Sequence, residues 1–326
     1  MAVAIRAHAT PPRAPRWLVT LRWVLRGAGL LGCAAAIAVT QELVSWALRG
    51  GEPLTPPGVE ALLVYRALAL AAGASLLVLA ELLPRLIERG ERLFEPFGSL
   101  LPLAVLAVCV LLKAMLGPEN GAYAGLVHED GVVEYATSAF YFGAGCFAVV
   151  VARGLLRRDD RLLGVLWGGL AVALVIVSLE EISWGQRLFG VPTPALLQDN
   201  VQHEMNLHNL PLMQKFLHAA YIGIGLFGSF AWALLGERGP ARFREIVGWL
   251  VPRSWLLACF LPVAVFYGVF DFTPSRWVGS DGLRFGFVST YDQEPAELLL
   301  ALGFLLFAAQ AFARLWDRLG VSDTGR

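Results

Sequence analysis

The sequence predicts an all-α, polytopic integral membrane protein, and three observations support this. Of the 326 residues, 57% are hydrophobic and only 16% are charged, whereas a soluble protein carries about 25% charged residues. The apolar residues form runs of about 20, the length that a helix needs to cross the hydrocarbon core. Basic residues gather at alternate connections between these runs. Helices are expected because an open strand would leave its backbone groups unpaired in lipid.

About eight apolar runs follow one another along the chain. They cover residues 27–48, 61–83, 99–116, 133–152, 162–182, 212–235, 254–272 and 295–315. The connections are short, so residues 27–315 are predicted to form one membrane domain. A basic tail at 1–26 precedes it, a second tail at 316–326 follows it, and the longest connection is the polar loop 183–211.

Arginine placement predicts the orientation, since basic residues favour the cytoplasmic side. Most of the 26 Lys and Arg residues share one side if the chain starts in the cytoplasm. Both termini are therefore expected there, with loop 183–211 and most acidic residues outside. The composition is typical of bacteria, so the protein is expected in a bacterial cytoplasmic membrane. Its partner is then the lipid bilayer, and the net charge of zero argues against nucleic acid.

The first polar motif closes the fifth run with the sequence SLEEISWGQR, residues 178–187. Glu180 and Glu181 lie near the outer edge of the hydrocarbon, at the negative end of the predicted helix, where anions are disfavoured. A cation, a proton or Arg187 must compensate the negative charges of these two carboxylates. A functional carboxylate pair is one interpretation, because polar groups at the membrane boundary are costly. The other is a helix-end cluster paired to Arg187.

The second polar motif is NVQHEMNLHN, residues 200–209. If the segment is helical, Asn200, Glu204 and His208 are four residues apart and share one face. A carboxylate and an imidazole at this spacing can bind one metal ion or transfer one proton. The alternative is an ordinary amphipathic loop helix with a solvated polar face.

Further acidic residues open two of the runs. Glu134 begins the fourth and Glu297 the eighth, and both should meet the outer boundary where Glu180 and Glu181 end. The positive end of the helix dipole explains acids at these positions equally well. His218, two turns into the sixth run, is interpreted as a packed histidine at a helix interface.

The two motifs resemble a pattern in uncharacterised bacterial multi-pass membrane proteins. In these proteins an E-E-I-S-W-G-Q-R segment precedes N-x-Q-x-E-x-N-L-H-N, and the resemblance covers the fourth to sixth runs best. It implies a family but no established activity.

Three functions remain open from the sequence. The first is a metal- or acid/base-dependent hydrolase or transferase that acts on a lipid or lipid-linked substrate. The second is a proton-coupled transporter, and the third is a structural or accessory membrane protein.

For the enzyme, the predicted catalytic residues are Glu180, Glu181, Glu204 and His208. A divalent metal ion would be the cofactor, with Glu181, Glu204 and His208 as ligands. Arg187, Asn200 and Asn206 are predicted to bind substrate, with support from Glu134, His203 and Glu297.

Overall fold

The computed structural model describes residues 16–38, 40, 66, 70, 73, 77, 80–81, 94–116, 122–127, 131–186, 191–198, 200, 204–236, 239–280 and 282–320. Helices dominate these residues, and the extended contacts among them are two isolated bridges from Arg284 to Val278 and Val288. Six described helical stretches are long and apolar enough to cross a membrane. The predicted all-α membrane fold is therefore confirmed at this level. The chain divides into two units, Met1–Glu88 and Arg89–Arg326.

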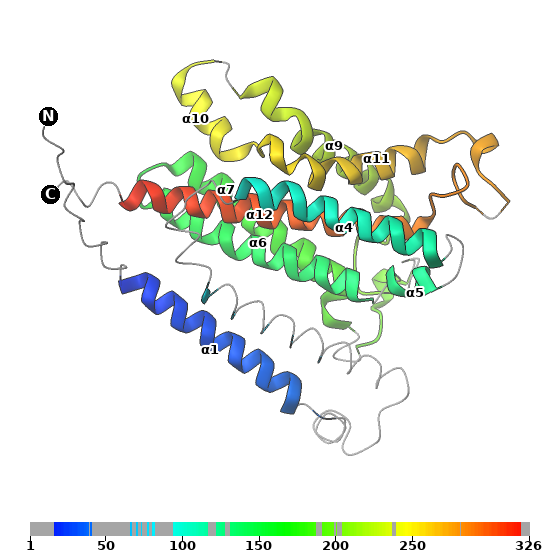
Figure 1. The fold of residues 1–326 in the computed structure, drawn as a ribbon, viewed down its shortest axis with the longest axis horizontal. Helices are drawn as coiled ribbons and strands as arrows, with labels where there is room; N and C mark the ends of the chain where they lie inside the picture. Colours follow the sequence, from blue (N-terminus) through cyan, green and yellow to red (C-terminus); the bar gives the residue numbers. More distant parts are fainter. Residues whose placement is uncertain are drawn as a thin grey trace, which may run out of the picture. The chain divides into compact units, whose positions relative to one another are not determined.

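The first unit contains helix α1 (Arg16–Ala38), labelled in Figure 1. It packs against helical residues that lie between Arg66 and Glu81. A Cβ atom built on Gly29 would come within 2.7 Å of the Gly73 carbonyl oxygen, so the two backbones nearly touch. Arg26 Nε donates to Glu81 Oε1 at 2.8 Å, and Arg66 Nε donates to the Ala36 carbonyl at 2.7 Å. Because Arg26 pairs with Glu81 and Ala36 with Arg66, α1 and these helical residues run antiparallel.

Helix α1 starts before the first predicted apolar run. It begins at Arg16, so residues 16–26 of the predicted basic tail are helical. The charged turn remains helical because Arg22 and Arg26 both pair with Glu81. The helix ends at Ala38, whereas residues 41–48 and most of the predicted span 61–83 lie outside the described residues.

The second unit supplies the remaining helices. They are α4 (Phe94–Leu116), α5 (Ala122–Val127), α6 (Val132–Leu156), α7 (Arg161–Glu181), α9 (Pro211–Leu235), α10 (Ala241–Leu250), α11 (Leu257–Phe272) and α12 (Gln293–Gly320). Short 3-10 turns lie between them: η2 (Ser183–Gly185), η3 (Ala195–Leu197), η4 (Ser254–Leu256), η5 (Ser275–Trp277) and η6 (Thr290–Asp292). Thus α4, α6, α7, α9, α11 and α12 correspond to the last six predicted runs, with residues 254–256 in η4 rather than in α11.

Helix α10 is an addition to the predicted elements. It ends where Val251 adopts an extended conformation before Pro252, because proline disfavours a helical residue in front of it. Arg242 on α10 pairs with Asp160, the N-cap of α7, at 2.7 Å. The Arg242 guanidinium lowers the pKa of Asp160 below its usual value.

Helix α12 occupies the centre of the second unit, between α6 and α11 (Figure 1). It contacts α4, α6 and α11, while α7 packs on α6 and α9 packs on α11. Phe307 of α12 stacks on Trp167 of α7 with a centroid distance of 5.3 Å. The α9–α11 contact needs Gly225, since a Cβ atom there would lie 2.8 Å from the Phe260 carbonyl oxygen.

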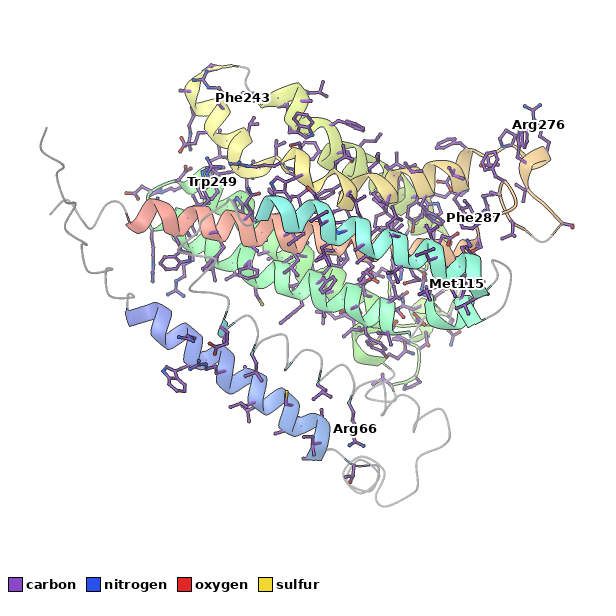
Figure 2. All side chains as sticks on the ribbon, viewed as in Figure 1. Arg66, Met115, Phe243, Trp249, Arg276 and Phe287 are labelled. Carbon is purple, nitrogen blue, oxygen red and sulfur yellow. The ribbon has the colours of Figure 1, made fainter. Side chains whose placement is uncertain are left out.

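Apolar side chains cover the outside of the second unit, and polar ones lie within it. Met115, labelled in Figure 2, is 80% exposed, and Val165 and Phe216 are similarly open. Glu181 and Glu297, by contrast, are buried. A water-soluble surface would not be covered in this way, so the exterior fits a lipid bilayer.

Candidate functional site

The turn after α7 follows an unusual left-handed path. Ser183, Trp184 and Gly185 have φ values of 47°, 55° and 76°. Left-handed backbone is unfavourable for residues other than glycine, so surrounding contacts must hold Ser183 and Trp184 there. The turn sends the Trp184 indole back toward α7, where its Nε1 donates to Glu180 Oε1 at 2.7 Å.

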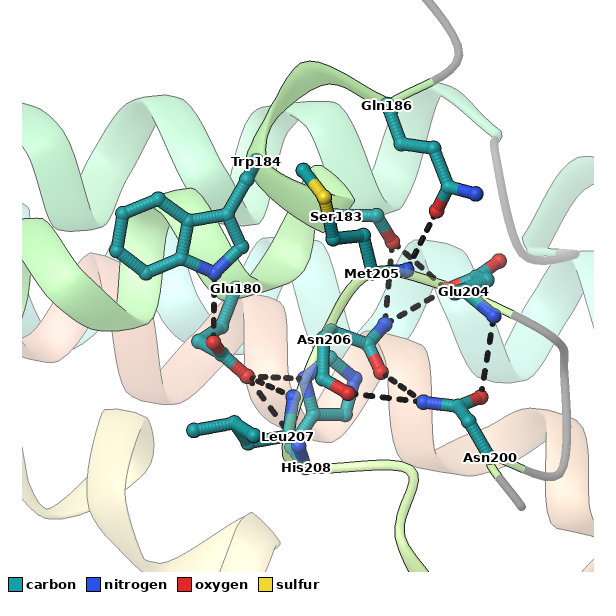
Figure 3. Close-up of polar contacts among 10 residues, drawn as sticks. All are labelled: Glu180, Ser183, Trp184, Gln186, Asn200, Glu204, Met205, Asn206, Leu207 and His208. Atoms are coloured by element: carbon teal, nitrogen blue, oxygen red, sulfur yellow. Dashed lines mark hydrogen bonds and ion pairs between the residues drawn. The ribbon is translucent and has the colours of Figure 1, made fainter. Parts of the chain in front are cut away.

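Glu180 is compensated by several donors from loop 183–211 (Figure 3). The backbone amide groups of Leu207 and His208 donate to Glu180 Oε2 at 2.6 and 3.2 Å. His208 Nδ1 lies 3.5 Å from the same oxygen. The predicted need for compensation is therefore met by His208, an indole and two amides. Arg187, the partner considered from the sequence, lies outside the described residues.

Glu204 belongs to a second network, which ties the loop to itself. Its Oε2 accepts hydrogen bonds from Ser183 Oγ at 2.8 Å and from Asn206 Nδ2 at 2.7 Å. Asn200 Nδ2 donates to the Asn206 carbonyl at 2.9 Å and to Asn206 Oδ1 at 2.7 Å. All four side chains are buried. Polar groups buried in this way stabilise a single loop conformation.

The expectation of a helical face through Asn200, Glu204 and His208 is wrong. Residues 204–210 form bends and turns. Asn200 and Glu204 still meet, since the Glu204 amide donates to Asn200 Oδ1 at 3.3 Å, but His208 faces Glu180. Among the described residues no three His, Cys, Asp or Glu side chains are placed to hold a metal ion. The predicted ligands Glu181, Glu204 and His208 are thus not assembled around one ion.

Glu181 belongs to a buried carboxylate cluster. It interacts electrostatically with Glu297 and Glu294 at the start of α12 and with Glu134 at the start of α6. Glu181, Glu294 and Glu297 are 7%, 6% and 8% exposed. Glu134, Glu181 and Glu297 therefore lie close enough to interact, at the end of α7 and the starts of α6 and α12.

Three tyrosines complete the carboxylate cluster. Tyr267 of α11 donates to Glu297 Oε1, and Tyr221 of α9 lies within hydrogen-bonding reach of the same carboxylate. Tyr221 and Tyr267 stack with a centroid distance of 4.9 Å. Tyr141 of α6 lies near both Glu181 and Glu297. The sequence analysis missed all three, because a tyrosine in an apolar run looks like a core residue.

His218 lies between this cluster and the exposed end of α11. Its ring packs on Tyr267 at a centroid distance of 4.5 Å, and its Nδ1 lies 2.9 Å from Asp271 Oδ1. The histidine is at a helix interface, as predicted, but it also has an acidic partner. About a quarter of the His218 side chain is exposed.

Two predicted site residues, Arg187 and His203, lie outside the described residues. No protein family, curated protein or solved structure matches the chain. The geometry of the chain's own residues therefore carries the functional inference.

Proposed function

We propose that the chain is an eight-span protein of a bacterial cytoplasmic membrane, with both termini in the cytoplasm. The antiparallel pairing of α1 with the helical residues between Arg66 and Glu81 supports two spans in addition to the six apolar stretches. Residues that this orientation places on the same side of the membrane also pair with one another. Asp160 pairs with Arg242 on the cytoplasmic side, and His218 pairs with Asp271 on the outer side. The motif resemblance to bacterial multi-pass proteins fits this assignment.

We propose further that the protein is a proton-coupled transporter whose proton-binding group is the buried carboxylate cluster. The observation that carries this proposal is the burial of Glu181 beside Glu297, with Glu294 and Glu134 close by. Several ionised carboxylates in a low-dielectric interior repel one another. Such a group therefore holds at least one proton or cation, and its members titrate as a unit.

The aromatic groups around the cluster support proton transfer to its carboxylates. Tyr267 hydrogen-bonds to Glu297 and packs against His218, which pairs with Asp271. This series begins at a partly exposed aspartate and ends at a buried glutamate. Chains of carboxylate and imidazole groups within membrane segments are typical of proton pathways.

A second candidate function is acid/base chemistry on a lipid or lipid-linked substrate. The observation that favours it is the pair of His208 and Glu180, in which a carboxylate faces Nδ1 of an imidazole that is 30% exposed. A carboxylate that orients a histidine is the arrangement of a general base. Backbone strain at Ser183 and Trp184 also fits a functional site.

Proteoliposomes that contain a pH-sensitive dye test the transporter. Solute gradients from different chemical classes are imposed, and internal pH is followed for wild type, Glu181→Gln, Glu297→Gln and the control Glu245→Gln, whose carboxylate pairs with Arg242. We expect solute-driven proton flux in wild type and Glu245→Gln and its loss in the two cluster variants. Equal flux in all four proteins would contradict the proposal. Absence of flux, together with lipid turnover that His208→Ala abolishes, would favour the enzyme.

A further inference from the structure

A large apolar cavity lies on the opposite side of α12 from the carboxylate cluster. Its volume is about 510 Å³, within the range of about 300–1,000 Å³ that is usual for ligand sites. Helix α4 forms one wall through Leu106 and Val110, α11 another through Leu261 and Val265, and α12 contributes Leu299. All three helices belong to the stretches that are long and apolar enough to cross a membrane.

The cavity opens at its side between α4 and α11. Leu103, Val110 and Val265 line it and are also 51%, 45% and 52% exposed. In a bilayer this opening faces hydrocarbon, because both helices present apolar side chains outward. Apolar cavities exclude water and accept apolar ligands, so a lipid chain is the occupant that the surroundings supply.

One end of the cavity is polar, and its lysine is buried. Lys113, which is 1% exposed, pairs with Asp292 and donates to Ser289 Oγ at 3.3 Å. Tyr123 donates to Asp292 Oδ1 at 2.9 Å. Burial and the neighbouring Asp292 raise the pKa of Tyr123, so the phenol keeps its proton. The Lys113 ammonium also lies over the Phe287 ring, 4.7 Å from its centroid.

The charge at this polar end is balanced. Lys113 and Asp292 are the charged residues among the described side chains that line the cavity, and each neutralises the other. An additional anion would compete with Asp292, whereas a hydroxyl or ester oxygen can accept from the ammonium or donate to the carboxylate. The chemistry therefore favours an uncharged polar head.

The dimensions of the cavity match one leaflet. From Leu103 to Lys113 is ten residues along α4, or about 15 Å at the rise of a helix. This is about half of the 30 Å hydrocarbon thickness of a bilayer. Lys113 lies near the end of α4 and Asp292 just before α12, so the polar end is at the membrane boundary and the apolar walls extend inward.

We infer that this cavity binds the hydrocarbon chain of a single-chain amphiphile with an uncharged polar head, which lies beside Lys113 and Asp292. The inference does not depend on the carboxylate cluster, since no residue of that cluster lines the cavity. A ligand could thus be present whether or not the cluster binds protons.

Photolabelling of the purified full-length protein in liposomes tests the inference. The probe is a monoacylglycerol with a photoreactive group within its chain, and labelled peptides are identified by mass spectrometry. We expect saturable labelling of α4 and α11. Unlabelled monoacylglycerol should compete at least about tenfold better than the fatty acid of equal chain length, because the fatty acid places a second anion beside Asp292.

Two matched tryptophan substitutions on α4 locate the label. Leu106 lines the cavity, whereas Leu111 is 59% exposed and lines neither this cavity nor a second one beside α4 and α6. Leu106→Trp should abolish saturable labelling, and Leu111→Trp should leave it unchanged. Leu261→Trp fills the same space from α11 and should act like Leu106→Trp.

Several results would overturn the inference. Unsaturable labelling spread over all exposed apolar positions would indicate ordinary boundary lipid. Equal loss of labelling in Leu106→Trp and Leu111→Trp would also overturn the inference, because of the two only Leu106 lines the cavity. Crosslinks from Cys109, which also lines the cavity, to another part of this chain or to a second copy would show that polypeptide fills the space. The competition experiment needs no variant, so misfolding of a tryptophan variant does not decide the result.

Discussion

Glu180 and Glu181 are neighbours in the chain, yet their carboxylates lie in opposite environments. Glu180 accepts hydrogen bonds from Trp184, Leu207 and His208 of the loop that follows α7. Glu181 faces Glu297 and other carboxylates in the interior. The end of α7 thus separates a carboxylate that stabilises the loop from one that is held against electrostatic repulsion.

The two glutamates should respond differently to neutralisation. Glu180→Gln removes the charge from several hydrogen bonds and should destabilise the protein by about 2 kcal/mol. Glu181→Gln relieves repulsion and should leave stability unchanged or increase it. Thermal unfolding in detergent measures both variants. Equal destabilisation by the two substitutions would contradict this division.

Asn206 should be needed for the conformation of loop 183–211. Asn206→Ala removes donors to Glu204 and Ser183 and an acceptor for Asn200. Buried groups left without partners should reduce stability by about 1–3 kcal/mol, and amide hydrogen exchange at residues 204–210 should become faster. The control is Gln198→Ala, since Gln198 is exposed in the same loop. Similar exchange in both variants would contradict a structural role for the network.

Gly185 should resist substitution because of its backbone. Its φ of 76° is unfavourable for a residue with a Cβ atom, so Gly185→Ala should cost about 1–2 kcal/mol. Gly168→Ala is the matched control, since Gly168 is helical and a Cβ atom there would meet open space. That control should be neutral or slightly stabilising. Unfolding measurements that show the same change for both would exclude the left-handed turn as the cause.

The pair of Asp160 and Arg242 should add a small pH-dependent stability. The pKa of Asp160 is lower in the folded protein, so the pair stabilises the fold above the usual aspartate value. This contribution is lost as pH falls through the folded value, below about pH 4. Arg242 is 51% exposed, which limits the effect to about 0–1 kcal/mol. Asp160→Asn, which keeps the cap of α7, should lessen the loss of thermal stability between pH 7 and pH 3; an undiminished loss would argue against the pair.

The six long apolar helices were predictable from the sequence because hydrocarbon thickness imposes length and composition on a helix that crosses it. The helical start of α1 at Arg16 was not predicted, because Arg22 and Arg26 pair with Glu81, which belongs to a distant segment. Helical spacing along the chain cannot reveal such a pair. Helix α10 was missed because it is amphipathic and shorter than a span.

The candidate site was predictable in part. Proximity of Glu134, Glu181 and Glu297 followed from helix ends that meet at one boundary. The separation of Glu180 from Glu181 did not, because it depends on the left-handed turn at Ser183 and Trp184. The roles of Tyr221 and Tyr267 were not predictable either, because the packing of α9 on α11 directs their hydroxyl groups.

The capping box of η6, formed by Ser289 and Asp292 directly before α12, connects the cavity to the carboxylate cluster. Asp292 accepts from the Ser289 amide and also holds Lys113, while Glu294 and Glu297 follow on the same rigid helix. A movement of this helix start would therefore carry Asp292 and the two buried acids together. If occupancy of the cavity alters the affinity of the acids for protons, protons must alter the affinity of the cavity by the same factor.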